Sequence, residues 1–320
     1  MARRRRGRDS SQEAADAVAR MLSTAQGRRA ALIVLLLALI IWGGWWAWQH
    51  WHASSQQTYI AATTNPAGTI RIATWNLRKF SERQKPGQHP PDLVEIAKII
   101  KGGGFDLLAI QEVQQEGQEV AKLRRQLNEP WRHVISERTG NNERFAFIYR
   151  EDRVELIDTP RLMGGPDAST FDRVPFIATF KAGQFDFVLV TVHLSYTDTA
   201  RRRREAEALA RFAKDMAAHA SEKDVIVLGD FNEQHQRGNL HYFDEQGWTR
   251  LIGEPTNLGS SEIYDNLLID RQFTREWTGR LGVIRFDESD FANDDKMAME
   301  SVSDHRPAWA EFSTLGPDDD

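Results

Sequence analysis

Short apolar segments alternate with helical patterns from about residue 69 to the end of the chain. Helices are predicted at 91–101, 118–127 and 198–218, the first with Asp92 at its start and glycines after its end. We predict strands at residues 70–75, 106–110, 144–149, 174–180, 185–193, 225–228, 263–269 and 308–312. This alternation, which shows no internal repeat, predicts one mixed α/β domain at 69–315 and a disordered acidic tail at 316–320.

A different pattern precedes this domain. Residues 30–48, AALIVLLLALIIWGGWWAW, form an uncharged run of 19 residues. A helix of that length spans roughly 28 Å, close to the hydrocarbon thickness of a bilayer, and its tryptophans suit a membrane interface. A cleaved signal peptide is the alternative, but bulky Trp and His residues after the run leave no good cleavage site. We therefore predict a retained transmembrane anchor in the lipid bilayer, followed by a linker at 49–68.

Charge is distributed unevenly on the two sides of this anchor. Residues 1–29 carry a net charge of +5, and the whole chain carries −5, so the remainder is strongly acidic. Arginines before an anchor orient the amino terminus to the cytoplasm. We predict a basic cytoplasmic tail at 1–29 and a single-pass protein whose main domain is periplasmic or extracellular. The acidic domain argues against a protein that coats DNA through bulk charge, and the absence of cysteine excludes disulfides and thiol chemistry.

The segment 225–232, VIVLGDFN, is the first candidate for chemistry. A buried strand here runs into a glycine and delivers Asp230 and Asn232 at the edge of a sheet. A carboxylate and an amide at such an edge can hold a metal, orient a water or bind a phosphate oxygen. They can also form an Asx turn that satisfies their own backbone. Matching polar groups at the ends of other strands would favour a site.

Five further segments carry such groups. They are Asn76 in IATWNL, Gln111 and Glu112 in LLAIQEV, His193 in VLVTVHL, Asp265 in YDNL, and Asp304 with His305 in SDHRP. Polar groups that converge on one rim describe a site. Because the set is rich in oxygen donors and has no thiol, it suits Mg²⁺, Mn²⁺ or Ca²⁺ rather than structural zinc. The chain lacks a phosphate-binding G-x-x-x-x-G-K-[ST] loop, a G-x-S-x-G elbow and an H-E-x-x-H helix, which argues against NTP binding, serine hydrolysis and zinc proteolysis.

The motifs WN, QE, strand-final His, GDFN, YD and SDH, in this order, resemble the endonuclease/exonuclease/phosphatase superfamily over residues 70–312. The resemblance implies a four-layer α/β/β/α sandwich, as in deoxyribonuclease I, with two sheets flanked by helices and the site at one rim. The deoxyribonuclease I branch is the most similar, because NERFAFIYR and DRVP look like its segments. Two positions depart from relatives. Gln114 replaces an arginine of that branch that enters the minor groove, and Arg78 replaces a metal-binding acid of abasic-site endonucleases.

The resemblance also implies a role for each polar residue. The implied metal ligands are Glu112 and Asp304; the catalytic residues are His193, Glu143, Asp230, Asp265 and His305; the phosphate-binding residues are Asn76, Asn232 and Arg173. Asp230 would orient or deprotonate the attacking water. Glu143 would support the first histidine and Asp265 the second, because a carboxylate partner fixes the imidazole tautomer and favours its protonated form. Which histidine acts as acid and which as base stays open.

These features predict a membrane-anchored, metal-dependent phosphodiesterase, with Mg²⁺ as the first choice of metal, that hydrolyses DNA outside the cytoplasm. The same chemistry on a phospholipid head group or an inositol phosphate is the alternative, because the anchor holds an acidic domain near lipid. A catalytically inactive tethered adaptor would require a missing catalytic residue, and every matched motif is intact. The basic run at residues 201–204, RRRR, fits either a solvated helix face or a phosphate-binding surface.

Overall fold

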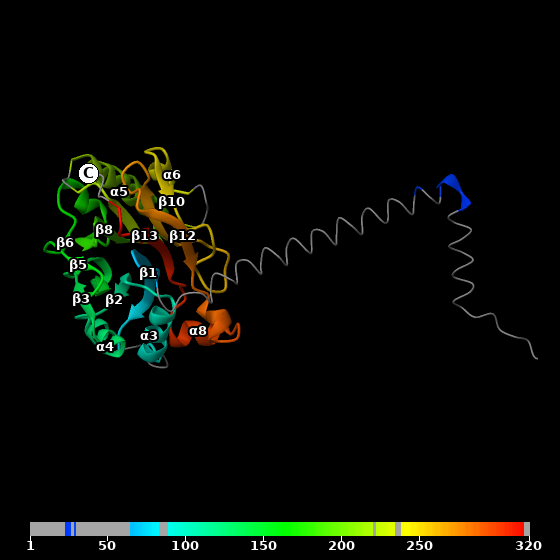
Figure 1. The fold of residues 1–320 in the computed structure, drawn as a ribbon, viewed down its shortest axis with the longest axis horizontal. Coiled ribbons are helices and arrows are strands. Elements are labelled where there is room, and N and C mark those ends of the chain that lie inside the picture. The colour runs from blue at the N-terminus through cyan, green and yellow to red at the C-terminus, as the bar shows by residue number, and fades with distance from the viewer. Residues whose placement is uncertain are drawn as a thin grey trace, which may run out of the picture. The chain divides into compact units, whose positions relative to one another are not determined.

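The computed structural model describes residues 23–26, 29, 65–82, 89–219, 222–233 and 238–316. The chain divides into two compact units, Met1–Ala61 and Ala62–Asp320, and the second contains all the elements described below (Figure 1). The predicted anchor at 30–48 lies outside the described residues, as do most of the predicted basic tail, nearly all of the linker and residues 317–320. Within the described ranges, no helix has the length and apolarity needed to cross a bilayer.

Two mixed β-sheets form the centre of the second unit. The first sheet has the order β12-β13-β1-β2-β4-β3 and the second β10-β11-β9-β8-β7-β5, with β6 paired to β7. Only β1–β2 and β8–β9 are parallel among the pairs of described strands. The strands are β1 (Thr69–Phe80), β2 (Leu107–Val113), β3 (Trp131–Ile135), β4 (Arg144–Arg150), β5 (Glu155–Leu156), β6 (Arg161–Leu162), β7 (Phe176–Ala182), β8 (Phe185–His193), β9 (Val225–Asp230), β10 (Trp248–Arg250), β11 (Asp265–Asp270), β12 (Trp277–Val283) and β13 (Ala308–Ser313).

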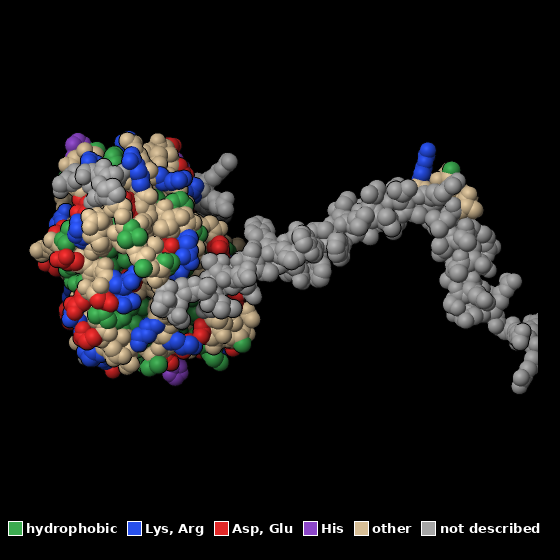
Figure 2. All heavy atoms as spheres, viewed as in Figure 1, with side chains coloured by type: hydrophobic (Ala, Val, Ile, Leu, Met, Phe, Trp, Pro, Cys, Tyr) green, Lys and Arg blue, Asp and Glu red, His purple; other side chains and the backbone are tan. Residues whose placement is uncertain are grey.

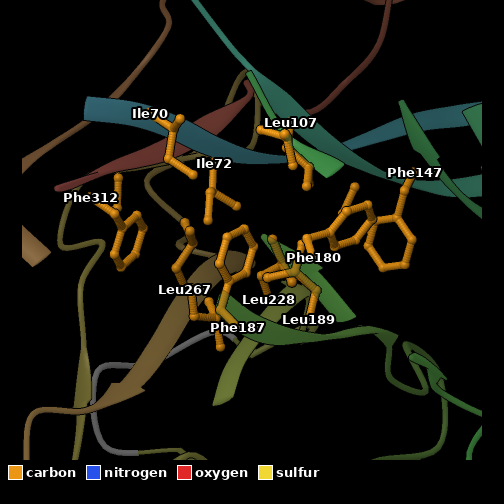
Figure 3. Close-up of a cluster of buried hydrophobic side chains, with 14 of the residues drawn as sticks. Ile70, Ile72, Leu107, Phe147, Phe180, Phe187, Leu189, Leu228, Leu267 and Phe312 are labelled. Carbon is orange, nitrogen blue, oxygen red and sulfur yellow. The ribbon is translucent and has the colours of Figure 1, made fainter. Parts of the chain in front are cut away.

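The core lies between the two sheets. Side chains alternate between the faces of a strand, so β8 directs Phe187 and Leu189 toward the other sheet. There they join Ile72 of β1 and Phe147 of β4, as Figure 3 shows. The intervening Val190 belongs to a second cluster on the opposite face. A nine-residue strand that is buried on both faces explains why residues 185–193 are almost continuously apolar.

Helices cover the outer faces of both sheets. Leu209 of α5 packs in one cluster with Val190 of β8 and Val227 of β9, while α4 contacts β3 and β4 and lies beside α3. Asp92 caps α3 by accepting hydrogen bonds from the backbone N–H groups of Val94 and Glu95. The two-sheet α/β sandwich that the sequence predicted is therefore confirmed. The helices are α3 (Leu93–Gly102), α4 (Gln118–Leu127), α5 (Thr199–His219), α6 (His241–Asp244), α7 (Phe286–Ser289) and α8 (Asp295–Ser301), with 3₁₀ turns η1 (Gly140–Asn142) and η2 (Pro166–Thr170).

Gly229 is required by the close pairing of β8 and β9 next to the predicted site. Its φ is +143°, and a Cβ atom there would lie 2.1 Å from the carbonyl oxygen of Val192 on the neighbouring strand. A backbone oxygen held in a sheet cannot move aside easily. The glycine of GDFN therefore permits the strand pairing that precedes Asp230.

We expect Gly229→Ala to lower the free energy of unfolding by roughly 2–5 kcal/mol, because it adds both backbone strain and a steric clash. Gly164→Ala is the matched control, since no atom lies within 4 Å of the added Cβ and its φ is not positive. Urea unfolding of both variants measures the difference. Equal stability of the two variants would contradict the inference that the β8–β9 pairing requires glycine at position 229.

Candidate active site

Three adjacent strands of the second sheet bring His193, Asp230 and Asp265 into one row. In the parallel pair β8–β9, His193 lies opposite Asp230, and in the antiparallel pair β9–β11, Asp265 lies opposite Asp230. His193 and Asp230 are the last residues of their strands, and Asp265 is the first of its own. All three side chains therefore leave the sheet at the same rim. Strand register brings together residues that lie far apart in the sequence.

The first sheet contributes Asn76 and Glu112 to the same place. The Asn76 Nδ2 donates to Asp230 Oδ2 at 2.9 Å and to Glu112 Oε1 at 3.0 Å, so one amide connects the two sheets at the rim. The β1–β2 pairing shifts register after Asn76, and Glu112 has a φ of +58°. Irregularities of this kind turn side chains out of their regular alternation and occur often at active sites.

The first histidine forms a chain with an acid and an arginine. His193 Nδ1 lies 2.9 Å from Glu143 Oε2, and the Arg173 Nε donates to the same oxygen at 2.7 Å. The other ring nitrogen, Nε2, lies 3.5 Å from Asp230 Oδ2. Burial alone would lower the pKa of His193, but the hydrogen bond to Glu143 and the charge of Asp230 raise it above its ordinary value, against the opposing charge of Arg173.

Because the guanidinium of Arg173 opposes protonation of His193, we expect Arg173→Met to raise the pKa of that histidine. The limb of the pH–activity profile that reports His193 should therefore move to higher pH. Rate measurements between pH 5 and 10 would detect the shift. Arg161→Met is the control, because Arg161 is paired with Asp158 at an exposed position. A profile that keeps its position in Arg173→Met would contradict the prediction.

The second histidine has an acid partner of its own. His305 Nδ1 lies 2.7 Å from Asp265 Oδ2, and His305 Nε2 lies 3.8 Å from Asp230 Oδ2. Burial lowers the pKa of His305, but the charges of Asp265 and Asp230 outweigh it and raise the pKa to about 10. His305 is therefore an imidazolium at neutral pH. Its backbone N–H donates to the Ser303 hydroxyl, which donates in turn to the Asn76 carbonyl at 2.6 Å.

Asp230 lies between the two histidines and is 1 % exposed. Its Oδ2 faces both Nε2 atoms, while its Oδ1 accepts a hydrogen bond from the backbone N–H of Asn232 at 2.8 Å. The side-chain amide nitrogen of Asn232 points elsewhere, donating to the Leu194 carbonyl at 2.9 Å. The structure thus brings Asn232 beside the site but uses its nitrogen to hold the loop after β8. Its predicted contact with substrate phosphate stays a prediction.

The donor set at this rim fits a divalent metal. Burial would raise the pKa of Glu112, but the charge of His193, the Asn76 amide and the Lys79 backbone N–H lower it, so the carboxylate is ionised. Glu112 and Asp230 share the Asn76 amide, which concentrates two hard oxygen donors in a small volume. The predicted second ligand, Asp304, lies with its Oδ2 3.4 Å from the Nε of Arg78.

A second group of metal-binding type is also present among the described residues. Ligand atoms of Asp230, Asp265 and His305 lie within 4.8 Å of one another, and Asp265 Oδ1 is a buried oxygen without a hydrogen-bond partner among the described atoms. A cation placed between His305 and Asp265 would have to displace the hydrogen bond that joins them. The oxygen donors around Glu112 therefore fit a cation better than this group does.

Several arginines that the sequence suggested for phosphate binding form contacts with other side chains of the protein. Arg173 binds Glu143 behind His193, and its Nη1 is buried, 3.7 Å from Asp172 Oδ2. In the run RRRR, Arg201 pairs with Asp172, Arg202 is buried, and Arg203 donates to the Tyr242 hydroxyl. Basic and acidic side chains are interspersed on the face that Figure 2 shows. The phosphate role predicted for Arg173 stays untested by this geometry.

Sequence reasoning did not single out Glu205, which holds two loops of the site. This α5 residue is 1 % exposed, and its two carboxylate oxygens accept from the backbone N–H groups of Asp172 at 2.9 Å and Ser195 at 2.8 Å. It therefore fixes both the turn that carries Arg173 and the loop after His193. The sequence does contain a signal for this role. Glu205 lies four residues before Leu209, and so on the same, buried face of the helix.

Comparison with known proteins identifies the family of this chain. The profile of the Endonuclease/Exonuclease/phosphatase family matches residues 73–305, which include every polar group described at the rim. The chain belongs to this family. It is accordingly a phosphoric ester hydrolase of a family whose enzymes generally depend on divalent metal, and the family predicted from the sequence is confirmed.

The individual relatives share only about a quarter of the aligned residues with this chain. Deoxyribonuclease-1 of Mus musculus is 26 % identical over 270 residues, which cover 75 % of this chain and 90 % of the relative. Endonuclease/exonuclease/phosphatase family domain-containing protein 1 of Rattus norvegicus is 25 % identical over 281 residues, and the match spans 76 % of this chain but only 49 % of the relative.

Solved structures show the same fold. A family protein from Bacteroides thetaiotaomicron superposes with a TM-score of 0.54 at 15 % identity and covers 76 % of this chain and 97 % of its own. A conserved protein of unknown function from Enterococcus faecalis gives a TM-score of 0.55 at 19 % identity, covering 76 % and 100 %. At these identities the likeness shows the fold alone.

Proposed function

We propose that this family member is a Mg²⁺-dependent phosphodiesterase that hydrolyses DNA. The observation that carries the proposal is the position of Asp230, whose Oδ2 lies 3.5 Å from His193 Nε2 and 3.8 Å from His305 Nε2. An acceptor between two acid-supported imidazoles can serve the proton transfers of a hydrolysis. The similarity to mouse Deoxyribonuclease-1 over 90 % of that relative supports DNA as the substrate.

In the proposed reaction, a water oxygen attacks phosphorus and the bond from phosphorus to the leaving oxygen breaks. Asp230 orients the water and accepts its proton. His305, protonated at neutral pH, donates a hydrogen bond to a phosphoryl oxygen or a proton to the leaving oxygen. Asn76 fixes Asp230 in place. A divalent metal held by Glu112 would neutralise phosphoryl charge and stabilise the leaving oxygen.

The membrane anchor and the location of the catalytic domain outside the cytoplasm belong to the same proposal. The uncharged run at 30–48 and the arginines that precede it support them. In cells that express the chain, protease added outside the cytoplasmic membrane should cleave the catalytic domain, and the protein should stay with membranes after a high-salt wash. Release by salt, or full protection from the protease, would contradict this part of the proposal.

A phospholipid head group or an inositol phosphate is the second candidate substrate. Gln114 stands where the deoxyribonuclease branch has an arginine, and the chain after residue 29 is strongly acidic. Both features weaken attraction to duplex DNA. Release of phosphocholine or inorganic phosphate from a small substrate panel would favour this candidate over DNA.

We expect the full-length chain in detergent to convert supercoiled plasmid to nicked and linear forms with Mg²⁺, and to lose this activity completely in EDTA. Activity should return when Mg²⁺ or Mn²⁺ is restored in excess, because the donor set is made of hard oxygens. Asp230→Asn protein prepared in parallel controls for contaminating nuclease. Failure to cleave both plasmid and a single-stranded oligonucleotide at every pH between 5 and 9 would overturn the DNA assignment, and cleavage in EDTA would overturn the metal dependence.

A further inference from the structure

Tyr196 is an exposed aromatic residue in the loop that follows the catalytic strand β8. It is 56 % exposed and is the aromatic member of five large hydrophobic side chains that are exposed within the described ranges. Isolated surface hydrophobic residues are common in soluble proteins and need no function. Tyr196, however, follows the catalytic His193 by only three residues.

A second ring connects Tyr196 to the catalytic centre. The rings of Tyr196 and Tyr264 meet edge to face, with centroids 6.4 Å apart at 80°. Tyr264 is 8 % exposed, and its ring centroid lies 5.9 Å from that of His305. The exposed ring therefore lies beside the site, separated from the second histidine by one buried ring.

The backbone of Tyr196 is held in place from α5. Arg202, which is 6 % exposed, donates through its Nη1 to the carbonyls of Ser195 at 2.8 Å and Tyr196 at 2.7 Å. Glu205 accepts from the Ser195 N–H at 2.8 Å. Burying a guanidinium and a carboxylate is costly unless both are well paired. Here the two charges fix a surface loop that presents a single exposed ring.

We propose that Tyr196 stacks on the nucleobase next to the scissile phosphate and thereby selects single-stranded DNA. Base–aromatic stacking tolerates any sequence because every base has a flat face. In a duplex these faces are covered by neighbouring bases, so a ring at the rim reaches them only in an unpaired strand. A phospholipid head group or an inositol offers no such face. This inference rests on the proposed function, and it specifies single-stranded DNA as the substrate.

The test compares two single-stranded oligonucleotides, one with normal bases and one with tetrahydrofuran abasic residues in their place. We expect Tyr196→Ala to lower kcat/KM on the normal strand by roughly 10- to 100-fold, mostly through KM, because stacking binds the substrate before reaction. Tyr196→Phe keeps the ring and should retain the wild-type value. On the abasic strand all three proteins should react equally, and more slowly than the wild type does on the normal strand.

Ile157→Ala, at another exposed apolar position (43 % exposed), is the matched control and should change neither substrate's rate. A similar loss on both strands in Tyr196→Ala would mean that the ring only supports the site's structure, and no loss on either would mean that it touches no substrate. Both results overturn the stacking proposal. Wild-type protein that cleaves neither strand nor plasmid would instead overturn the proposed function, so the two failures are distinguishable.

Discussion

Asp230→Asn is expected to lower kcat for DNA cleavage by about 10²–10⁴-fold, the usual contribution of a group that accepts a proton in the reaction. The substitution preserves the shape of the side chain, and its Oδ1 can still accept from the backbone N–H of Asn232. The new amide nitrogen cannot accept the hydrogen bond that Asp230 Oδ2 takes from Asn76 Nδ2, so the loss should reflect missing charge and basicity together with this lost contact. Initial rates on an oligonucleotide with excess Mg²⁺ measure it, and thermal melts establish whether the fold is retained.

The same variant should change the pH profile of its residual activity. The charge of Asp230 raises the pKa of both His193 and His305, so its removal should move the limbs that report these histidines to lower pH. Asp186→Asn is the control, because Asp186 pairs with Lys181 at a partly exposed site on β8. Full activity in Asp230→Asn, or a tenfold loss in both variants, would show that Asp230 is not the proton acceptor.

The strands that build the site could be predicted because their burial leaves a clear apolar pattern. Residues 185–193 and 225–228 lie in the middle of the second sheet, where both faces are covered. β12 was missed since its central residues Thr278, Gly279 and Arg280 are exposed at the edge of the first sheet and leave no such pattern. Helices α6 and α7 have four residues each, too few for a helical period to appear.

The members of the site could be named from motifs, but their partners depend on long-range geometry. The sequence places Asp230 after a strand, yet only the register of β8, β9 and β11 shows that it lies between His193 and Asp265. Arg173 was expected beside a phosphate, which stays a prediction, and its contact with Glu143 is one that no local pattern indicates. The predicted contact between each histidine and its acid depended on resemblance, and the structure places both pairs within hydrogen-bonding distance.

His305→Gln is expected to lower kcat by about 10²–10⁴-fold, since an amide cannot donate a proton to the leaving oxygen. The Gln side chain can still donate a hydrogen bond toward Asp265, so the buried carboxylate need not lose its partner. Single-turnover rates would separate this loss of chemistry from slower product release. A variant that retains wild-type kcat would assign the acid role to another group.

His305 should also make stability depend on pH in a defined direction. Its pKa is raised from 6.5 to about 10 on folding, so the folded state holds this proton more tightly than the unfolded state. The resulting stabilisation is complete below about pH 6.5 and is lost as the pH rises through 10. In urea unfolding with chelator present, the excess stability of the wild type over His305→Gln should therefore shrink by a few kcal/mol, to order of magnitude, between pH 6 and 10. A constant or widening difference would mean that Asp265 and Asp230 do not hold His305 protonated, and the proton for the leaving oxygen would have to come from elsewhere.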